Sequence, residues 1–114
     1  YGDFECGDNK IITLTGAPKN VKGKFNCAYN KLTTLQGAPK KVDDSFDCSS
    51  NRLITLKGAP KIVNGLFKCL CNKLTTLDYA PKNIGVKLIT NNNPLKEALI
   101  TVCSNNTASE TIVI

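Results

Sequence analysis

The sequence contains no histidine, and this absence limits the chemistry that the protein can perform. Histidine is the commonest general base and the usual partner of a nucleophilic side chain. Ser45, Ser49 and Ser50 therefore have no histidine to activate them. The acidic residues do not form an obvious inward-facing pair, and the sequence has no phosphate-binding loop. We expect no enzymatic activity and no cofactor.

The sequence also has no run of 18 apolar residues and no N-terminal pattern of a signal peptide, so no membrane association is expected. What it does contain suits one globular domain of 114 residues, of which 41% are hydrophobic and 21% charged. Fifteen Lys and Arg residues against nine Asp and Glu residues give a net charge of +6. This charge permits an acidic partner without requiring one.

A 21-residue repeat dominates the chain. We call each copy a coil: coils 1 to 4 are residues 1–21, 22–42, 43–63 and 64–84, and a partial fifth coil begins at residue 85. The consensus is F-x-C-x-x-N-x-L-x-x-L-x-G-A-P-x-x-V. Four copies in register at so many positions cannot arise by chance, and a period of this length indicates a repeat architecture.

This order of residues resembles the leucine-rich repeat, whose signature L-x-L-x-x-N-x-L begins with a strand. Phe and Cys occupy its first two apolar positions here. The repeat length and the recurring proline resemble the short bacterial subtype, and the G-A-P spelling resembles repeats of phage and other viral proteins. The resemblance covers residues 1 to about 95. It implies a curved solenoid with parallel strands on the concave face and extended convex segments, and it implies binding to other proteins.

The side-chain pattern favours the same fold class, a mainly-β repeat solenoid. In a strand, Phe25 and Cys27 are expected to point to one side while Lys24, Asn26 and Ala28 point to the other. One coil cannot bury its own apolar edge, so stacked coils must share a core. The recurring Asn is expected to bond the backbone of the adjacent turn. Each coil contains a proline, with a glycine two residues before it in coils 1 to 3, and this pattern argues against helices on the convex side. Tyr79 replaces that glycine in coil 4, so the turn of coil 4 is expected to differ.

The two ends of the predicted solenoid, residues 1–93, differ from each other. Residues 94–114 are predicted to be a C-terminal cap, in which Pro94 and the apolar spacing indicate a short helix over 94–101. Residues 111–114 could pair as a last strand. No cap precedes the first strand, which carries charges that discourage edge-to-edge association: Asp3, Glu5 and Asp8.

Four of the six cysteines form a ladder with one member per coil: Cys6, Cys27, Cys48 and Cys69. Side chains that face a core at every rung are expected to be buried, reduced thiols, which favours a reducing, intracellular setting. A line of sulfurs roughly 14 Å long cannot converge on one tetrahedral ion, so no metal site is expected. Disulfides between rungs are an alternative. Cys71 and Cys103 lie outside the ladder, and a bridge between them is a further alternative.

Basic residues form two more ladders. One follows each Asn and the other follows each Pro: Lys10, Lys31, Arg52 and Lys73; Lys19, Lys40, Lys61 and Lys82. They are either a solvated surface or two positive stripes suited to phosphates or an acidic protein. Recognition of nucleic acid would need aromatic residues between the charges, and only Tyr29 is placed to help.

The leading hypothesis is a non-enzymatic module that presents a rigid parallel sheet to a protein partner. The candidate surface consists of the outward residues Asp3, Glu5, Lys24, Asn26, Tyr29, Ser45, Asp47, Leu66, Lys68, Leu70, Lys87 and Ile89. Its apolar members in coils 4 and 5 are either a contact site or are covered by the C-terminal tail. The alternatives are nucleic-acid or other polyanion binding through the basic ladders, and a structural role in a larger viral assembly, including the virion, through the N-terminal edge.

Overall fold

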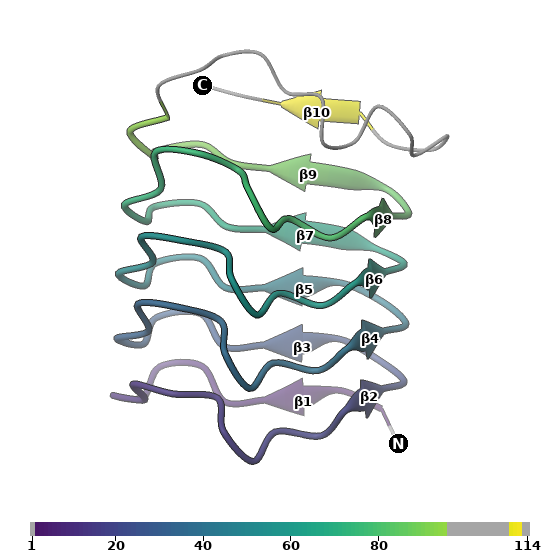
Figure 1. Ribbon diagram of the computed structural model, residues 1–114. Coiled ribbons are helices and arrows are strands. Elements are labelled where there is room, and N and C mark those ends of the chain that lie inside the picture. The colour runs from purple at the N-terminus through teal and green to yellow at the C-terminus, as the bar shows by residue number, and fades with distance from the viewer. Residues whose placement is uncertain (1, 96–109, 113–114) are drawn as a thin grey trace.

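The computed structural model describes residues 2–95 and 110–112, and every regular element among them is a short β-strand. The strands form one sheet of six and one of four, and the coils stack on one another (Figure 1). Coils 1 to 4 each contribute one strand to each sheet, and the fifth coil begins with β9. The predicted mainly-β parallel solenoid is thereby confirmed. No helix in the described part of the chain is long and apolar enough to cross a membrane.

The six-stranded sheet contains the strand that begins each coil. Its order is β1 (Phe4–Glu5), β3 (Phe25–Asn26), β5 (Phe46–Asp47), β7 (Leu66–Lys68), β9 (Lys87–Ile89) and β10 (Glu110–Ile112). Neighbouring strands from β1 to β9 pair in parallel with an offset of one repeat, so that Phe25 lies opposite Phe46 and Phe46 opposite Phe67. A slip of one residue would turn every side chain to the other face, so this register keeps the apolar residues inward.

The four-stranded sheet forms on the other side of the core. Its strands are β2 (Asn20–Val21), β4 (Lys41–Val42), β6 (Ile62–Val63) and β8 (Asn83–Ile84), again all parallel. The sequence predicted extended segments here and the structure pairs them into a sheet. The second residue of each strand is buried, so the coils also share apolar contact along this side.

A tight turn precedes each proline. In coil 1 the Leu14 carbonyl accepts a hydrogen bond from Ala17 N–H at 3.0 Å, and Gly16 between them has a φ of 97°. This is a type II β-turn, which requires a positive φ at its third residue. Coils 2 and 3 repeat it with glycine φ values of 94° and 95°. A Cβ added to Gly58 would lie 2.5 Å from the Leu35 carbonyl of the preceding coil, so close stacking of the turns also requires glycine.

Ladders of apolar side chains fill the space between the sheets. The rings of the four phenylalanines stack with centroids 5.1, 5.2 and 5.3 Å apart and planes within 5°. Phe25, Phe46 and Phe67 are completely buried, whereas Phe4 is half-buried at the open end. Full burial of one such side chain stabilises a fold by about 1.5–3 kcal/mol. The Leu, Val and Cys ladders complete a core that is continuous from coil to coil.

The recurring asparagines bond the backbone, as predicted. The Asn51 amide donates to the carbonyls of Cys48 and Cys27, at 3.0 and 3.1 Å, and accepts from Leu32 N–H at 3.0 Å. Its neighbours in the ladder make the same set of bonds: Asn30, Asn72 and Asn93. Each buried amide therefore connects its own coil to the preceding one. No buried side-chain nitrogen or oxygen in the described residues lacks a partner.

The ends of the stack agree with the sequence where the structure describes them. β10 pairs in parallel with β9, placing Ile112 opposite Ile89, so the expected last strand is present over 110–112 and the rest of its predicted range lies outside the described residues. Of the helix predicted over 94–101, only the first two residues are described, and the rest lies outside the described part of the chain. Leu95 is half-buried and packs against the core. At the other end, Cys6 and Ile11 remain half-buried beneath an open edge.

The cysteine ladder faces inward, as predicted. Cys27, Cys48 and Cys69 are completely buried, Cys6 is half-buried and Cys71 is exposed, and all five are free thiols in the structure. The bridge considered between Cys71 and Cys103 lies outside the described residues.

Burial also decides the acidity of these thiols. Removal from water, with the Asp47 carboxylate as the second cause, raises the pKa of the Cys69 thiol to about 12. Burial raises the pKa of the Cys48 thiol well above its ordinary value, and the neighbouring Cys69 and Cys27 add to the effect. Because the thiolate is the reactive form, these positions are unreactive while the chain is folded.

We predict that a thiol reagent labels Cys71 of the native protein rapidly and leaves Cys27, Cys48 and Cys69 unlabelled. All of them should react after denaturation, because burial alone protects the three. Peptide mass spectrometry before and after denaturation measures this. Rapid native labelling of Cys48 would contradict the inward orientation of the strand and with it the register of the sheet.

We predict that Asn51→Ala lowers the free energy of unfolding by about 3 kcal/mol, because a buried N–H and two carbonyls would lose their partner. Urea unfolding measures the change. Asn9→Ala is the matched control: Asn9 occupies the same repeat position but is exposed, and its amide donates to carbonyls of its own coil, those of Cys6 and Gly7. That variant should lose less than about 1 kcal/mol. Equal losses in the two variants would show that the bonds between coils do not matter.

Candidate functional site

The outward positions of the six-stranded sheet form two columns, which we call the sheet face. The first column is Asp3, Lys24, Ser45, Leu66 and Lys87, and the second is Glu5, Asn26, Asp47, Lys68 and Ile89. The structure therefore brings eleven of the twelve residues of the predicted surface onto one face, counting Leu70 just after β7. Tyr29 is the exception and lies in the turn after β3.

Tyr29 projects outward for a different reason from the others. Strand alternation would direct it inward, but its φ is 59°, in the left-handed region. Asp8, Ser50, Cys71 and Asn92 have the same conformation, so every coil turns at this position. The turn leaves the Tyr29 side chain 62% exposed at the margin of the sheet face.

In the first three coils several polar residues of the sheet face are bound to the backbone. Asp3 Oδ1 accepts from Lys24 N–H at 2.8 Å, and Ser45 Oγ accepts from Leu66 N–H at 3.0 Å. These side chains satisfy the first N–H of the next coil's strand. These bonds link one coil to the next and so stabilise the stack.

Asn26 and Asp47 have a similar structural role. The Oδ1 atom of each accepts from the N–H two residues later, Ala28 and Ser49, both at 2.9 Å. This local bond fixes the turn at the end of the strand. The Asn26 amide also donates to Glu5 Oε1 at 2.9 Å. Sequence reasoning assigned these positions to partner contact and could not see that the backbone needs them.

The sheet face changes character in coils 4 and 5. Lys68 and Ile89 occupy the column of Asn26 and Asp47, and neither side chain can accept a hydrogen bond. Leu66, Leu70 and Ile89 are half-buried on the outward side, and we call them the apolar patch. The N–H groups of Leu66 and Leu70 bond serine side chains of coil 3 instead, Ser45 Oγ at 3.0 Å and Ser49 Oγ at 3.2 Å, so the outward side chains of coil 4 do not serve the backbone of their own turn.

The described part of the tail does not cover the apolar patch. Residues 110–112 pair along the edge of β9, and so they extend the sheet in its own plane. Figure 1 shows β10 as the next strand of the stack. The remaining tail residues lie outside the described part of the chain. The alternative in which the tail folds over the patch therefore stays a prediction for those residues.

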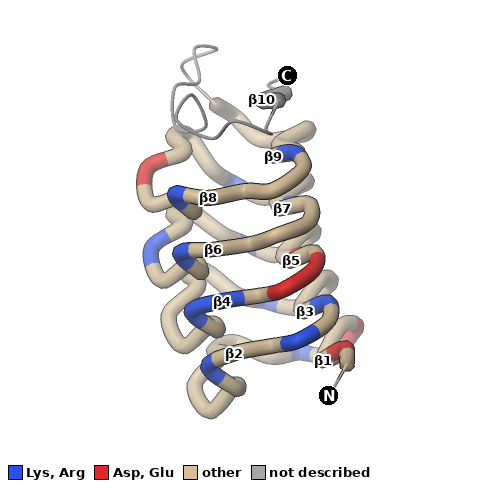
Figure 2. Tube along the Cα trace, turned by 90° about the vertical axis from the view of Figure 1, so that its right-hand side faces the viewer, with Lys and Arg blue, Asp and Glu red and all other residues tan. Residues whose placement is uncertain are grey.

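The two basic ladders lie elsewhere. All eight side chains are exposed, and basic positions recur in each coil beside the four-stranded sheet (Figure 2). In the second ladder, Lys40 N–H donates to the Lys19 carbonyl at 2.8 Å and Lys61 N–H to the Lys40 carbonyl at 3.0 Å, which holds the lysines one rung apart. Like charges about 5 Å apart repel by under ~1 kcal/mol per neighbouring pair in water.

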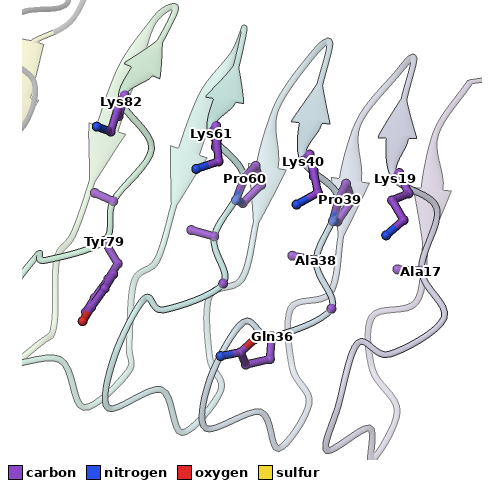
Figure 3. Close-up of a pocket in the computed structure, with 14 residues that line it drawn as sticks. Ala17, Lys19, Gln36, Ala38, Pro39, Lys40, Pro60, Lys61, Tyr79 and Lys82 are labelled. Atoms are coloured by element: carbon purple, nitrogen blue, oxygen red, sulfur yellow. The ribbon is translucent and has the colours of Figure 1, made fainter.

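The second ladder borders a groove of about 460 Å³ that the sequence did not reveal. The groove runs across the coils, and residues of all four coils line it (Figure 3). Small residues form its floor, including Ala38, Pro39, Ala59 and Pro60, and the lysines Lys19, Lys40, Lys61 and Lys82 form a row along it (Figure 3). We call it the lysine groove.

Tyr79 lies at the coil 4 end of the lysine groove (Figure 3). It occupies the third position of the type II turn between Leu77 and Ala80, where the other coils have glycine, and its φ is 72°. A bulky residue in this region is strained. Its side chain is 62% exposed, so burial does not compensate. The sequence carried two signals for this site, the lysine that follows each proline and the break in the glycine pattern at Tyr79.

No family model, no curated protein and no solved structure matches the chain. Its class therefore comes from its own coordinates: a two-sheet parallel β-solenoid of about four turns.

We predict that Tyr79→Gly raises the free energy of unfolding by about 1 kcal/mol, because it removes the strain of a positive φ. Urea unfolding measures the gain. Tyr79→Asn is the control for the side chain alone, since Asn tolerates the left-handed region, and it should give a smaller gain. A loss of stability in Tyr79→Gly would mean that the ring contributes to packing.

Proposed function

We propose that the protein is a non-enzymatic, leucine-rich-repeat-like module that binds a protein partner through the sheet face. The change of the sheet face at coil 4 is the observation that carries this proposal. Asn26, Ser45 and Asp47 accept hydrogen bonds from backbone N–H groups, so these outward polar residues have a structural reason to be there. The apolar patch has none, and clustered apolar side chains on an otherwise polar face are typical of a contact site.

The dimensions of the sheet face define the kind of contact. Six strands about 4.8 Å apart, with about five residues along each, give a face on the order of 500 Å². A standard stable interface needs about 800 Å² per partner. The contact therefore extends to the margin at Tyr29 or is a weak one. Tyr29 suits this role, because exposed aromatic residues frequently carry binding energy.

The rigidity of the solenoid supports the same function. Each rung of the sheet face is fixed by the backbone pairing and by the Asn ladder behind it, so little conformational freedom is lost on binding. Lys68 and Lys87 flank the apolar patch. A partner with an apolar centre and acidic residues at its rim would be complementary to it.

We predict that Leu66→Asp combined with Leu70→Asp abolishes capture of the partner and leaves the melting temperature nearly unchanged. The wild-type protein and its variants would be used as bait in lysate of the native host, with quantitative mass spectrometry as the readout. The proposal expects proteins that the wild type retains and the variant loses.

Ile12→Asp combined with Ile54→Asp is the matched control. It makes the same change at two aliphatic residues that are 72% and 64% exposed. They lie in the segments that connect a strand of the six-stranded sheet to a strand of the four-stranded sheet. Its capture should equal that of the wild type. Equal loss in both variants would contradict the proposal, and a large fall in melting temperature in the patch variant would show internal packing instead. Capture that falls steeply with salt would indicate a polyanion partner.

A further inference from the structure

No residue that lines the lysine groove belongs to the six-stranded sheet, so the groove calls for its own explanation. Four lysines, one from each coil, border it, and among the described residues that line it none carries a carboxylate. A hollow lined by charges of one sign concentrates ligands of the opposite sign. The groove is therefore suited to an anionic ligand that runs across the coils.

The strained turn at Tyr79 is a second, independent observation. Three coils place glycine at this position with φ between 94° and 97°, and in coils 2 and 3 the close stacking of the turns also requires it. Coil 4 places a tyrosine there, in the left-handed region and exposed at the end of the groove. Such strain concentrates at functional sites. An aromatic side chain held in that conformation, without burial, is explained by contact with a ligand.

We propose that the lysine groove binds an extended acidic peptide segment of a protein partner, with an apolar or aromatic residue of that segment against Tyr79. The site is separate from the sheet face, so it does not rest on the function proposed above. An extended peptide places alternate side chains about 6.6 Å apart on one face. The four lysines span about 15 Å, which matches two or three such carboxylates.

The side chains of the groove favour a peptide over a nucleic acid. Single-stranded nucleic acids bind through aromatic side chains on which successive bases stack, and the groove has one aromatic residue at one end. Its cations are all lysines, which lack the forked geometry that arginine offers to phosphate. The Ala and Pro floor, together with Tyr79, provides the apolar contact that a peptide side chain needs.

The test uses a fluorescein-labelled peptide of about eight residues, roughly 26 Å when extended, that alternates glutamate with serine and ends in phenylalanine. Fluorescence anisotropy with the full chain gives its dissociation constant. Lys40→Gln combined with Lys61→Gln should weaken binding about tenfold.

Lys31→Gln combined with Arg52→Gln is the matched control, because it removes two charges from the other ladder. It should weaken binding less than about twofold. All substituted side chains are exposed, and circular dichroism would verify that the variants are folded. No binding to the wild type, or equal weakening by the two double variants, would overturn the proposal.

Two further comparisons examine the identity of the occupant. Tyr79→Gly should raise the dissociation constant of the phenylalanine-ended peptide at least about threefold more than that of a serine-ended peptide, as expected for the loss of an aromatic pair. Equal weakening would overturn the contact with Tyr79. An oligo-dT probe of similar length should bind more weakly than the peptide. Tighter binding of oligo-dT would overturn the peptide proposal in favour of nucleic acid.

Discussion

The buried Asn amide is the interaction on which the rest of the structure depends. A coil of 21 residues has only two short strands, so many of its backbone groups lie in turns that neither sheet satisfies. Unpaired backbone groups inside a protein cost about 1–3 kcal/mol each. One amide per coil supplies donors to two carbonyls and an acceptor to an N–H of the preceding coil. It therefore holds the turn and the stacking interface together.

With the turns satisfied from inside, the outer surface is free to differ between coils. In coils 2 and 3 several outward side chains accept hydrogen bonds from backbone N–H groups, namely those of Asn26, Ser45 and Asp47. In coils 4 and 5 the outward positions hold Leu66, Leu70 and Ile89 instead, which make that part of the face apolar. The same fold thus carries a self-supporting polar half and an apolar half that we assign to binding.

The opposite side of the molecule shows the same separation of structure from surface. Glycine in the type II turns allows the coils to approach closely, and the lysines that follow each proline project from this regular frame. Tyr79 departs from the pattern at a cost in strain and stands at the end of the lysine row. Two faces of different chemistry, one apolar and one basic, are compatible with a module that contacts more than one segment of a partner.

The sequence by itself determined the solenoid, the period, the inward ladders of Phe25 and Cys27 and the role of the asparagines, because a residue that recurs at every rung must meet the same surroundings each time. Contacts that depend on the distance between coils were left to the tertiary structure. It alone decided that Val21 and Val42 lie in a second sheet, that Asp47 is bound to its own turn and that a left-handed turn is what directs Tyr29 outward. The lysine groove also required it, because a groove arises from the gap between stacked turns and the lysine row, and no single coil contains that gap.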